Sequence, residues 1–310
     1  MKPLSMYHMK PLVIYHDNCA DGFGAAFAAW LKFGFIAEYL PVNHNDTDTH
    51  LEYTGRDLYI LDFSFPREVM DHMLANAAKV VWLDHHKTAF EMWCGGIPES
   101  GVWTSAAFAH EDPHHVVLDN NKSGAMLAWE YFHPGAPAPK FIKLIDDRDR
   151  WVFQYPETKA FSEALFAGRP WTFAQWGDFF EGTDRFVHDG NVLLKAKAAA
   201  IEGMLPNARR CELPLFNTAD FGGPRHDRAY FVGLALNTNA HISDVGHELA
   251  VKSGTFGLVW YVDENLVVRC SLRSNGDYDV SAIAKVFGGG GHRNAAGFST
   301  DINTLSGWLA

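Results

Sequence analysis

Three short apolar runs, each ending in ionisable side chains, constrain the fold of this chain more than any other feature. They are residues 12–16 (LVIYH), 57–63 (DLYILDF) and 79–84 (KVVWLD), and the last is followed at once by His85 and His86. Continuous apolar runs of this length predict buried strands. Strands buried on both faces are typical of a parallel sheet that is covered by helices.

Helices are predicted in the segments that follow two of these strands. Residues 22–33 (GFGAAFAAWLKF) are rich in alanine, and a second helix is expected at about 66–78. Alternating strands and helices predict a doubly wound, mainly parallel α/β sheet. In such sheets, sites form at the carboxyl ends of the strands. We therefore expect His16, Asp62 and Asp84 to converge on one edge of the sheet.

The length of 310 residues predicts two domains. So does a change in sequence pattern after residue 206, where strand-like apolar runs replace the mainly helical pattern of the middle of the chain. We expect an α/β domain at 1–190, a linker helix at 191–208 and a smaller α/β domain at 209–310. Within the smaller domain, the runs 255–262 and 265–272 predict a β-hairpin.

Charge and cysteine content exclude several classes of protein. The net charge is −11, and the basic stripe that holds long duplex DNA is not visible in the sequence. An acidic chain still binds anionic substrates where metal ions supply positive charge locally. The 4 cysteines form no CxxC pair, which favours a reducing compartment such as the cytoplasm. No apolar run approaches the length of a membrane span.

Several segments carry carboxylates or imidazoles at places where metal ligands are expected. An isolated Asp or His after a strand is more often a cap or a surface residue, but Asp84, His85 and His86 are adjacent, and this combination suits Mn²⁺ or a similar ion. The turn from His16 to Gly22 contains Asp21, which could serve as an N-cap or as a ligand. Residues 145–151 (IDDRDRW) add three carboxylates, although charges that alternate in this way also occur on solvated helix faces.

Together these segments resemble the DHH phosphoesterase superfamily, which is named for the motif present here at residues 84–86. The four motifs lie in the family order over about residues 12–151. The segments 270–274 (CSLRS) and 279–284 (DVSAIA), followed by 288–297 (GGGGHRNAAG), resemble the DHH-associated C-terminal domain. The likeness covers most of the chain, and the members that it resembles are RecJ-like and oligoribonuclease-like.

The resemblance implies roles for individual residues. His16 would bind a first metal ion, Asp62 would bridge two ions, and three further residues would complete the second site: Asp21, His85 and Asp147. His86 would contact the scissile phosphate, and Asp84 would orient the histidines. In the C-terminal domain, the substrate would be held by Arg273 and His292 together with the backbone amides of Gly289, Gly290 and Gly291.

Two positions depart from the family pattern or leave a choice open. Cys19 stands where many relatives have an aspartate, so it is either a thiolate ligand or a small residue packed in a turn. Sulfur suits Mn²⁺ less well than oxygen does. In the fourth motif, Asp146, Asp147 and Asp149 are alternatives, with Asp147 preferred and Asp149 next.

The function expected from the sequence is the manganese-dependent hydrolysis of phosphodiester or phosphomonoester bonds in short oligonucleotides or nucleotides. Two ions would take part, with Mg²⁺ or Co²⁺ as substitutes for Mn²⁺. One alternative is an exopolyphosphatase or pyrophosphatase, and another is a nucleotide-binding protein that does not catalyse. A nucleic-acid repair factor that acts with partners is a third. We expect no membrane association and no obligate protein partner, and a homodimer is left open.

Overall fold

The computed structural model describes residues 9–43, 51–104, 113–215, 230–276 and 278–309. The chain divides into two compact units, Met1–Leu194 and Lys195–Ala310. Each unit contains one six-stranded sheet.

The sheet of the first unit is parallel except at one edge. Its strand order is β2-β1-β3-β4-β6-β5, and β5 alone among these pairs antiparallel to its neighbour. The strands are β1 (Leu12–His16), β2 (Glu38–Val42), β3 (Asp57–Leu61), β4 (Lys79–Asp84), β5 (Val102–Thr104) and β6 (His115–Asp119). The carboxyl ends of β1, β3 and β4 therefore lie side by side, which places the ionisable residues that follow them at one edge.

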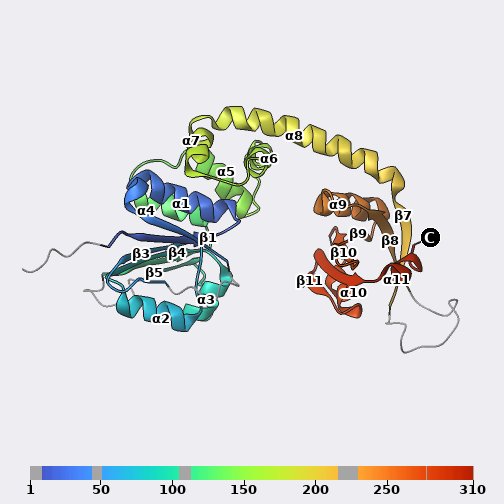
Figure 1. The fold of residues 1–310 in the computed structure, drawn as a ribbon, viewed down its shortest axis with the longest axis horizontal. Coiled ribbons are helices and arrows are strands. Elements are labelled where there is room, and N and C mark those ends of the chain that lie inside the picture. The colour runs from blue at the N-terminus through green and yellow to red at the C-terminus, as the bar shows by residue number, and fades with distance from the viewer. Residues whose placement is uncertain (1–8, 44–50, 105–112, 216–229, 277, 310) are drawn as a thin grey trace, which may run out of the picture. The chain divides into compact units, whose positions relative to one another are not determined.

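Helices cover both faces of this sheet, as Figure 1 shows. The helices of the first unit are α1 (Ala20–Phe33), α2 (Arg67–Asn76), α3 (Lys87–Cys94), α4 (Gly124–Phe132), α5 (Lys140–Asp149), α6 (Thr158–Ala167) and α7 (Phe173–Glu181). Alternate residues of the strands enter two separate cores, because successive strand side chains point to opposite faces. Val13 and Leu83 pack in the core beneath α1 and α4, whereas Ile14 and Trp82 pack in the core that contains residues of α2 and α3.

A long helix, α8 (Thr183–Met204), begins in the first unit and ends in the second. A single 3₁₀ turn at Leu205–Asn207 follows it directly. Of the linker helix expected at 191–208, residues 191–204 belong to this longer helix and residues 205–207 to the 3₁₀ turn.

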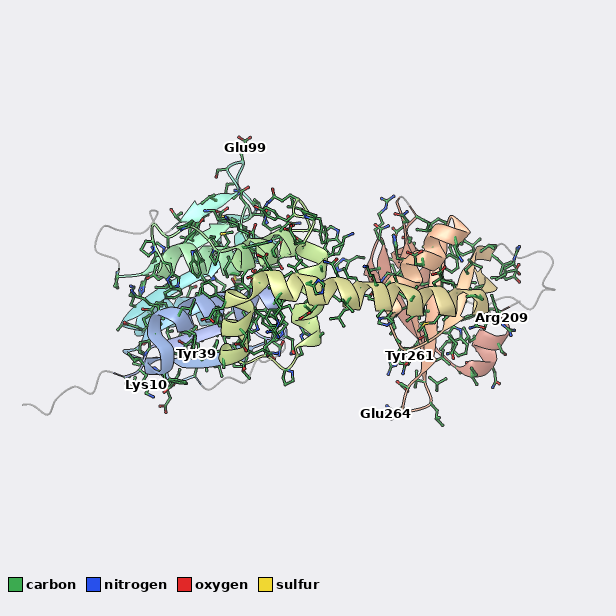
Figure 2. The ribbon with its side chains drawn as sticks, turned by 90° about the horizontal axis from the view of Figure 1, so that it is seen from above. Lys10, Tyr39, Glu99, Arg209, Tyr261 and Glu264 are labelled. Atoms are coloured by element: carbon green, nitrogen blue, oxygen red, sulfur yellow. The ribbon has the colours of Figure 1, made fainter. Side chains whose placement is uncertain are left out.

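The second unit has a mixed sheet in the order β11-β12-β10-β9-β8-β7. Its strands are β7 (Arg209–Pro214), β8 (Tyr230–Asn237), β9 (Phe256–Val262), β10 (Val268–Ser274), β11 (Gly290–His292) and β12 (Ala295–Thr300), and its helices are α9 (Ile242–Ser253), α10 (Val280–Val286) and α11 (Ile302–Ser306). β9 and β10 form the predicted hairpin, with Tyr261 near the end of β9 and Glu264 in the turn (Figure 2).

The predicted fold class is confirmed: both units are α/β, and the first has a doubly wound, mainly parallel sheet. The strands at 12–16 and 79–84 have the predicted bounds. Within the described residues, no helix is long and apolar enough to cross a membrane.

Candidate metal centre

Carboxylates and imidazoles meet at the carboxyl edge of the first sheet. His16 is the last residue of β1, Asp62 follows β3 directly, and Asp84 ends β4 immediately before His85 and His86. Asp62 has a positive φ of 54°, and its backbone N–H donates to the carbonyl of Leu83 over 2.9 Å. The chain thus turns sharply after β3 and directs the side chain of Asp62 into the cluster.

Asp62 lies at the centre of this group. Its Oδ1 is 3.1 Å from Nε2 of His85, and its Oδ2 is 3.7 Å from Nδ1 of His16. The side chain is 1% exposed, and within the described residues neither carboxylate oxygen has a hydrogen-bond donor in good geometry. A buried, ionised carboxylate whose oxygens accept no well-formed hydrogen bond is energetically unfavourable unless a cation binds it.

Asp21 joins α1 to the N-terminus of α4. Its two carboxylate oxygens accept hydrogen bonds from the backbone N–H groups of Gly124 and Ala125 at 2.6 and 2.8 Å, and Oδ2 lies 3.4 Å from Nε2 of His85. The positive end of the α4 dipole therefore faces the cluster. Position 124 must be glycine here, because an added Cβ would lie 2.5 Å from Cβ of Asp62.

Asp84 is fully buried and holds the histidine motif in shape. Its Oδ1 accepts from the backbone N–H groups of His85 and His86 at 2.7 and 3.2 Å and lies 2.7 Å from Nδ1 of His86. Its other oxygen accepts from the hydroxyl of Ser64. These contacts fix the His86 ring, whose opposite nitrogen, Nε2, points away from Asp84.

Three overlapping groups of side chains bring their ligand atoms within 4.8 Å of one another. The groups are His16 with Cys19 and Asp62, then Asp62 with His85 and His86, then Asp21 with His85 and Asp149. Asp62 is shared by the first two groups and His85 by the last two. Because of this sharing, the three groups form one continuous cluster of candidate metal ligands.

The charges of the cluster are unbalanced without a cation. Burial opposes ionisation of Asp62, but the neighbouring His16 and His85 outweigh it, so the pKa of Asp62 lies below its ordinary value. Burial raises the pKa of Asp21, as does the negative charge of Asp62, and burial likewise raises the pKa of Asp149. Burial alone would lower the pKa of His85, but Asp62 and Asp21 raise it to about 10. The donor set is thus short of positive charge and fits divalent cations.

The three aspartates at the end of α5 have different surroundings. Asp149 lies in the cluster, with Oδ2 3.5 Å from Nε2 of His85. Asp147 is instead engaged by the segment after α5: its oxygens accept from the backbone N–H groups of Gln154 and Tyr155, at 2.8 and 3.2 Å, and from the hydroxyl of Thr158. The structure therefore brings together His16, Asp21, Asp62 and His85 as expected, but places Asp149 beside them where Asp147 was expected.

Asp146 contacts the N-cap of α4, the helix whose N-terminus faces the cluster. It accepts from the backbone N–H of Ser123 at 2.8 Å, and the Ser123 side chain caps α4. Ser123 and Gly124 are residues that the sequence analysis missed. The polar turn at 120–123, directly before the apolar helix, is an N-cap signal that could have identified them.

The predicted substrate-binding residues lie together on one part of the second sheet. Arg273 of β10 and His292 of β11 both pair with Ala295 of β12, from its two sides. Paired residues of neighbouring strands project to the same face, so Arg273 and His292 share a face. The guanidinium of Arg273 donates to Oγ of Ser243 and to the carbonyl of Leu272, both over 2.9 Å.

Two glycines of the run before His292 are required by the backbone, Gly289 by a close approach and Gly291 by its conformation. A Cβ on Gly289 would lie 2.1 Å from the carbonyl oxygen of Gly297, and Gly291 has a positive φ of 141°. Gly290, in contrast, has nothing within 4 Å of an added Cβ. The run thus leaves main-chain groups accessible next to the face that carries Arg273 and His292.

Comparisons with known proteins find relatives of this chain both by sequence and by structure. No protein-family model matches the chain. An uncharacterized protein, R106, of Acanthamoeba polyphaga mimivirus is 31% identical over 93% of this chain and 67% of its own length. Oligoribonuclease NrnB of Bacillus subtilis is 24% identical over 95% of this chain and 73% of its own length. Among solved structures, the pGpG-specific phosphodiesterase PggH of Vibrio cholerae matches with a TM-score of 0.52 at 12% identity, covering 96% of this chain and 95% of that one.

The α/β sheet gathers aspartates and histidines at its carboxyl edge, in groups that could hold metal ions. The motif Asp84-His85-His86, the accompanying cluster and the relatives identify the family. The chain belongs to the DHH phosphoesterase superfamily and is oligoribonuclease-like.

Proposed function

We propose that this protein hydrolyses phosphodiester bonds in short oligonucleotides or dinucleotides with the help of two divalent cations, with Mn²⁺ as the natural ion. The observation that carries the proposal is the buried Asp62 carboxylate, which accepts no hydrogen bond in good geometry from the described residues and stands between His16 and His85. The names of the relatives, an oligoribonuclease and a dinucleotide phosphodiesterase, support this substrate class.

The ligands follow from the three overlapping groups. The first cation would be held by His16, Cys19 and Asp62, and the second by Asp21, Asp62, His85 and Asp149. Oxygen and imidazole ligands suit Mn²⁺, with Mg²⁺ or Co²⁺ as substitutes. Bound cations supply a nucleophilic water at neutral pH and stabilise negative charge on the reacting phosphate.

Residues of the histidine motif would act on the substrate directly. Burial works to lower the pKa of His86, but the hydrogen bond with Asp84 and its negative charge outweigh it and raise that pKa. A protonated His86 donates a hydrogen bond to a phosphate oxygen and neutralises charge that develops there. Asp84 is a positioning residue, because it fixes the His86 ring through Nδ1.

The second unit would anchor the substrate. Arg273 and His292, with the accessible backbone of Gly289, Gly290 and Gly291, offer donors for a terminal phosphate or a base. The net charge of −11 and the small number of basic residues favour short substrates over long polymers. A reducing compartment such as the cytoplasm suits a chain whose 4 cysteines are all free.

The proposal is tested with purified protein that has been stripped of metal and then given Mn²⁺. We expect it to release nucleoside monophosphates from linear dinucleotides, and to lose this activity completely on chelation. Cyclic dinucleotides, adenosine bisphosphate, polyphosphate and kilobase DNA are assayed in parallel. Turnover of polyphosphate above that of dinucleotides would favour an exopolyphosphatase. Full activity in metal-free protein would rule the proposal out, and binding without turnover of any substrate would favour a non-catalytic nucleotide-binding protein.

Cys19 gives a prediction about metal preference. It occupies the N-cap position of α1 without making a side-chain cap hydrogen bond, and its sulfur lies in the ligand group of His16 and Asp62. Replacing sulfur by oxygen in Cys19→Asp should raise the affinity for Mn²⁺ by about tenfold, because Mn²⁺ prefers oxygen ligands.

The measurement is calorimetric titration with Mn²⁺ and, separately, with Co²⁺. Wild-type protein loaded with Co²⁺ should show thiolate-to-metal charge-transfer absorption, and Cys19→Asp should lack it. Cys94→Ser, which changes an exposed cysteine in α3, is the matched control. Unchanged Mn²⁺ affinity together with no charge-transfer band in the wild type would make Cys19 a packing residue of the turn.

A further inference from the structure

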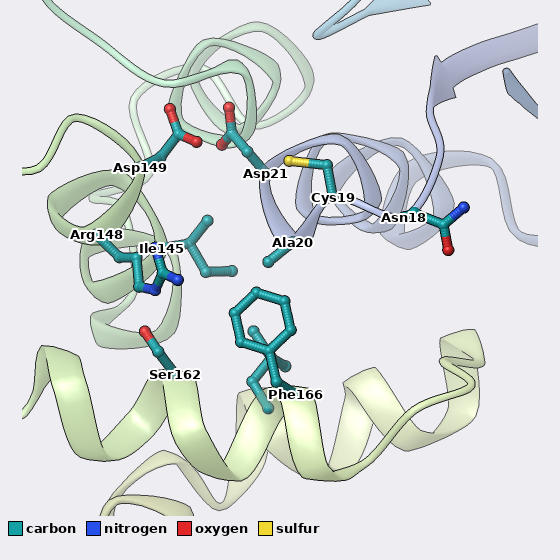
Figure 3. Close-up of a pocket in the computed structure, with 10 residues that line it drawn as sticks. Asn18, Cys19, Ala20, Asp21, Ile145, Arg148, Asp149, Ser162 and Phe166 are labelled. Atoms are coloured by element: carbon teal, nitrogen blue, oxygen red, sulfur yellow. The ribbon is translucent and has the colours of Figure 1, made fainter. Parts of the chain in front are cut away.

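A small cavity lies directly beside the metal centre, within the first unit. Its volume is about 160 Å³, and it shares Cys19, Asp21 and Asp149 with the cluster (Figure 3). Pockets that enclose a whole ligand usually measure about 300–1,000 Å³. The cavity is therefore suited to one part of a ligand whose remainder lies outside it.

The remaining walls are mostly apolar. Ala20 of α1, Ile145 of α5, and Leu165 and Phe166 of α6 line the cavity. Figure 3 shows the Phe166 ring directed from α6 toward Ala20. An aromatic ring on an apolar wall is a surface on which flat rings pack and stack.

Arg148 supplies the cavity with a positive charge, and no carboxylate of the described residues, Asp21 and Asp149 of the same lining included, forms an ion pair with it. Within the described residues, its guanidinium makes no ion pair and no hydrogen bond. It lies 5.3 Å from the Phe166 ring and 5.7 Å from the Trp151 ring. Figure 3 shows this guanidinium on the same side of the cavity as Ile145. A half-buried arginine without an acidic partner, in a chain of net charge −11, is placed to receive an anion.

A second arginine, Arg169, follows Phe166 by three residues and joins the cavity to the turn between β1 and α1. The Arg169 guanidinium lies 4.6 Å from the Phe166 ring and 4.4 Å from the Trp171 ring, and it donates to the carbonyl of Asn18 over 2.6 Å. Asn18 itself lines the cavity. Arg169 thereby fixes the end of α6 against the turn that carries Cys19 and Asp21.

We propose that this cavity binds the nucleotide unit next to the scissile phosphate, with its base against Phe166 and its phosphate on Arg148. The inference rests on the proposed function, because it assigns a subsite for the substrate of that same centre. It also implies that the first unit recognises a base by itself, through a cavity whose lining includes the proposed metal ligands Cys19, Asp21 and Asp149.

The binding test compares adenosine monophosphate with ribose 5-phosphate on the intact Mn²⁺-loaded protein by calorimetry. We expect the nucleotide to bind at least about tenfold more tightly, which is within the range for stacking one base on an aromatic ring. In Phe166→Leu, which keeps an apolar side chain without the aromatic face, the preference for the nucleotide should fall about tenfold. In Arg148→Gln, both ligands should bind about tenfold to a hundredfold more weakly, because a charge-assisted hydrogen bond to phosphate is lost.

The kinetic test uses the ratio of kcat/KM for a dinucleotide to that for bis-nitrophenyl phosphate, which has no nucleoside. This ratio should fall at least about tenfold in Phe166→Leu, mainly through KM. The matched controls change exposed residues of the same unit away from the cavity: Phe35→Leu for the aromatic ring and Arg185→Gln for the guanidinium. Both controls should keep the wild-type ratio.

The outcomes separate this subsite from the proposed function. Nucleotide binding that depends on Phe166 and Arg148 would support the subsite even where no hydrolysis occurs. Dinucleotide hydrolysis with unchanged constants in both variants would overturn the subsite and leave the proposed function standing. Equal binding of adenosine monophosphate and ribose 5-phosphate to the wild type would also overturn it. So would a loss of Mn²⁺ affinity in Phe166→Leu that accounts for the whole effect.

Discussion

Asp62→Asn should reduce kcat/KM for a dinucleotide by about 1,000-fold or more while leaving the fold intact. Asparagine has nearly the same shape, so the close packing of Gly124 against residue 62 is preserved. The substitution removes the negative charge that two of the ligand groups share. Cations contribute several kcal/mol of charge stabilisation in such centres, and about 4 kcal/mol corresponds to about 1,000-fold in rate.

Thermal unfolding gives the same prediction a readout that does not depend on turnover. A cation at 100 times its Kd stabilises the folded wild-type protein by about 2.7 kcal/mol, so Mn²⁺ should raise its Tm by several degrees. Asp62→Asn should lose most of this shift. Asp57→Asn, at the opposite end of β3, is the matched control and should respond to Mn²⁺ like the wild type. A full Mn²⁺-dependent shift and full activity in Asp62→Asn would remove the basis of the metal centre.

The sequence was sufficient to predict the residues that depend on strand ends. His16, Asp62 and Asp84 follow buried apolar strands, and parallel strands must bring their carboxyl ends to one edge. The pattern of apolar residues thus determined both the sheet and the position of the cluster. His85 and His86 come with Asp84, because they are its immediate neighbours in the chain.

Residues whose roles depend on how helices pack could not be predicted in the same way. Successive residues of a helix are separated by about 100° around its axis, so Asp146, Asp147 and Asp149 face different directions. The sequence shows that α5 ends in carboxylates, but not which of them faces the cluster. The approach of Gly124 to Asp62, and the cavity that Ala20 and Phe166 both line, likewise bring together segments that are distant in the chain.

Replacing Asp147 and replacing Asp149 should have opposite effects on stability and on the affinity for Mn²⁺. Asp147→Ala removes a buried carboxylate that accepts from Gln154, Tyr155 and Thr158, and should lower the free energy of unfolding by about 3 kcal/mol. Its affinity for Mn²⁺, measured at a temperature where the variant is folded, should remain close to that of the wild type. Denaturant unfolding without metal measures the first quantity, and calorimetric titration measures the second.

Asp149→Ala should show the reverse pattern, because its carboxylate faces His85 and accepts no hydrogen bond from the described residues. Burial raises the pKa of Asp149, so removing this group relieves an unfavourable charge in the metal-free protein and should leave its stability equal or slightly higher. The affinity for Mn²⁺ should fall at least about tenfold, since one oxygen ligand is lost. If Asp147→Ala instead abolished Mn²⁺ binding at full stability and Asp149→Ala bound Mn²⁺ normally, the fourth-motif ligand would be Asp147. The contacts of Asp147 with the segment after α5 would then have to open when the metal binds, at the expense of three hydrogen bonds.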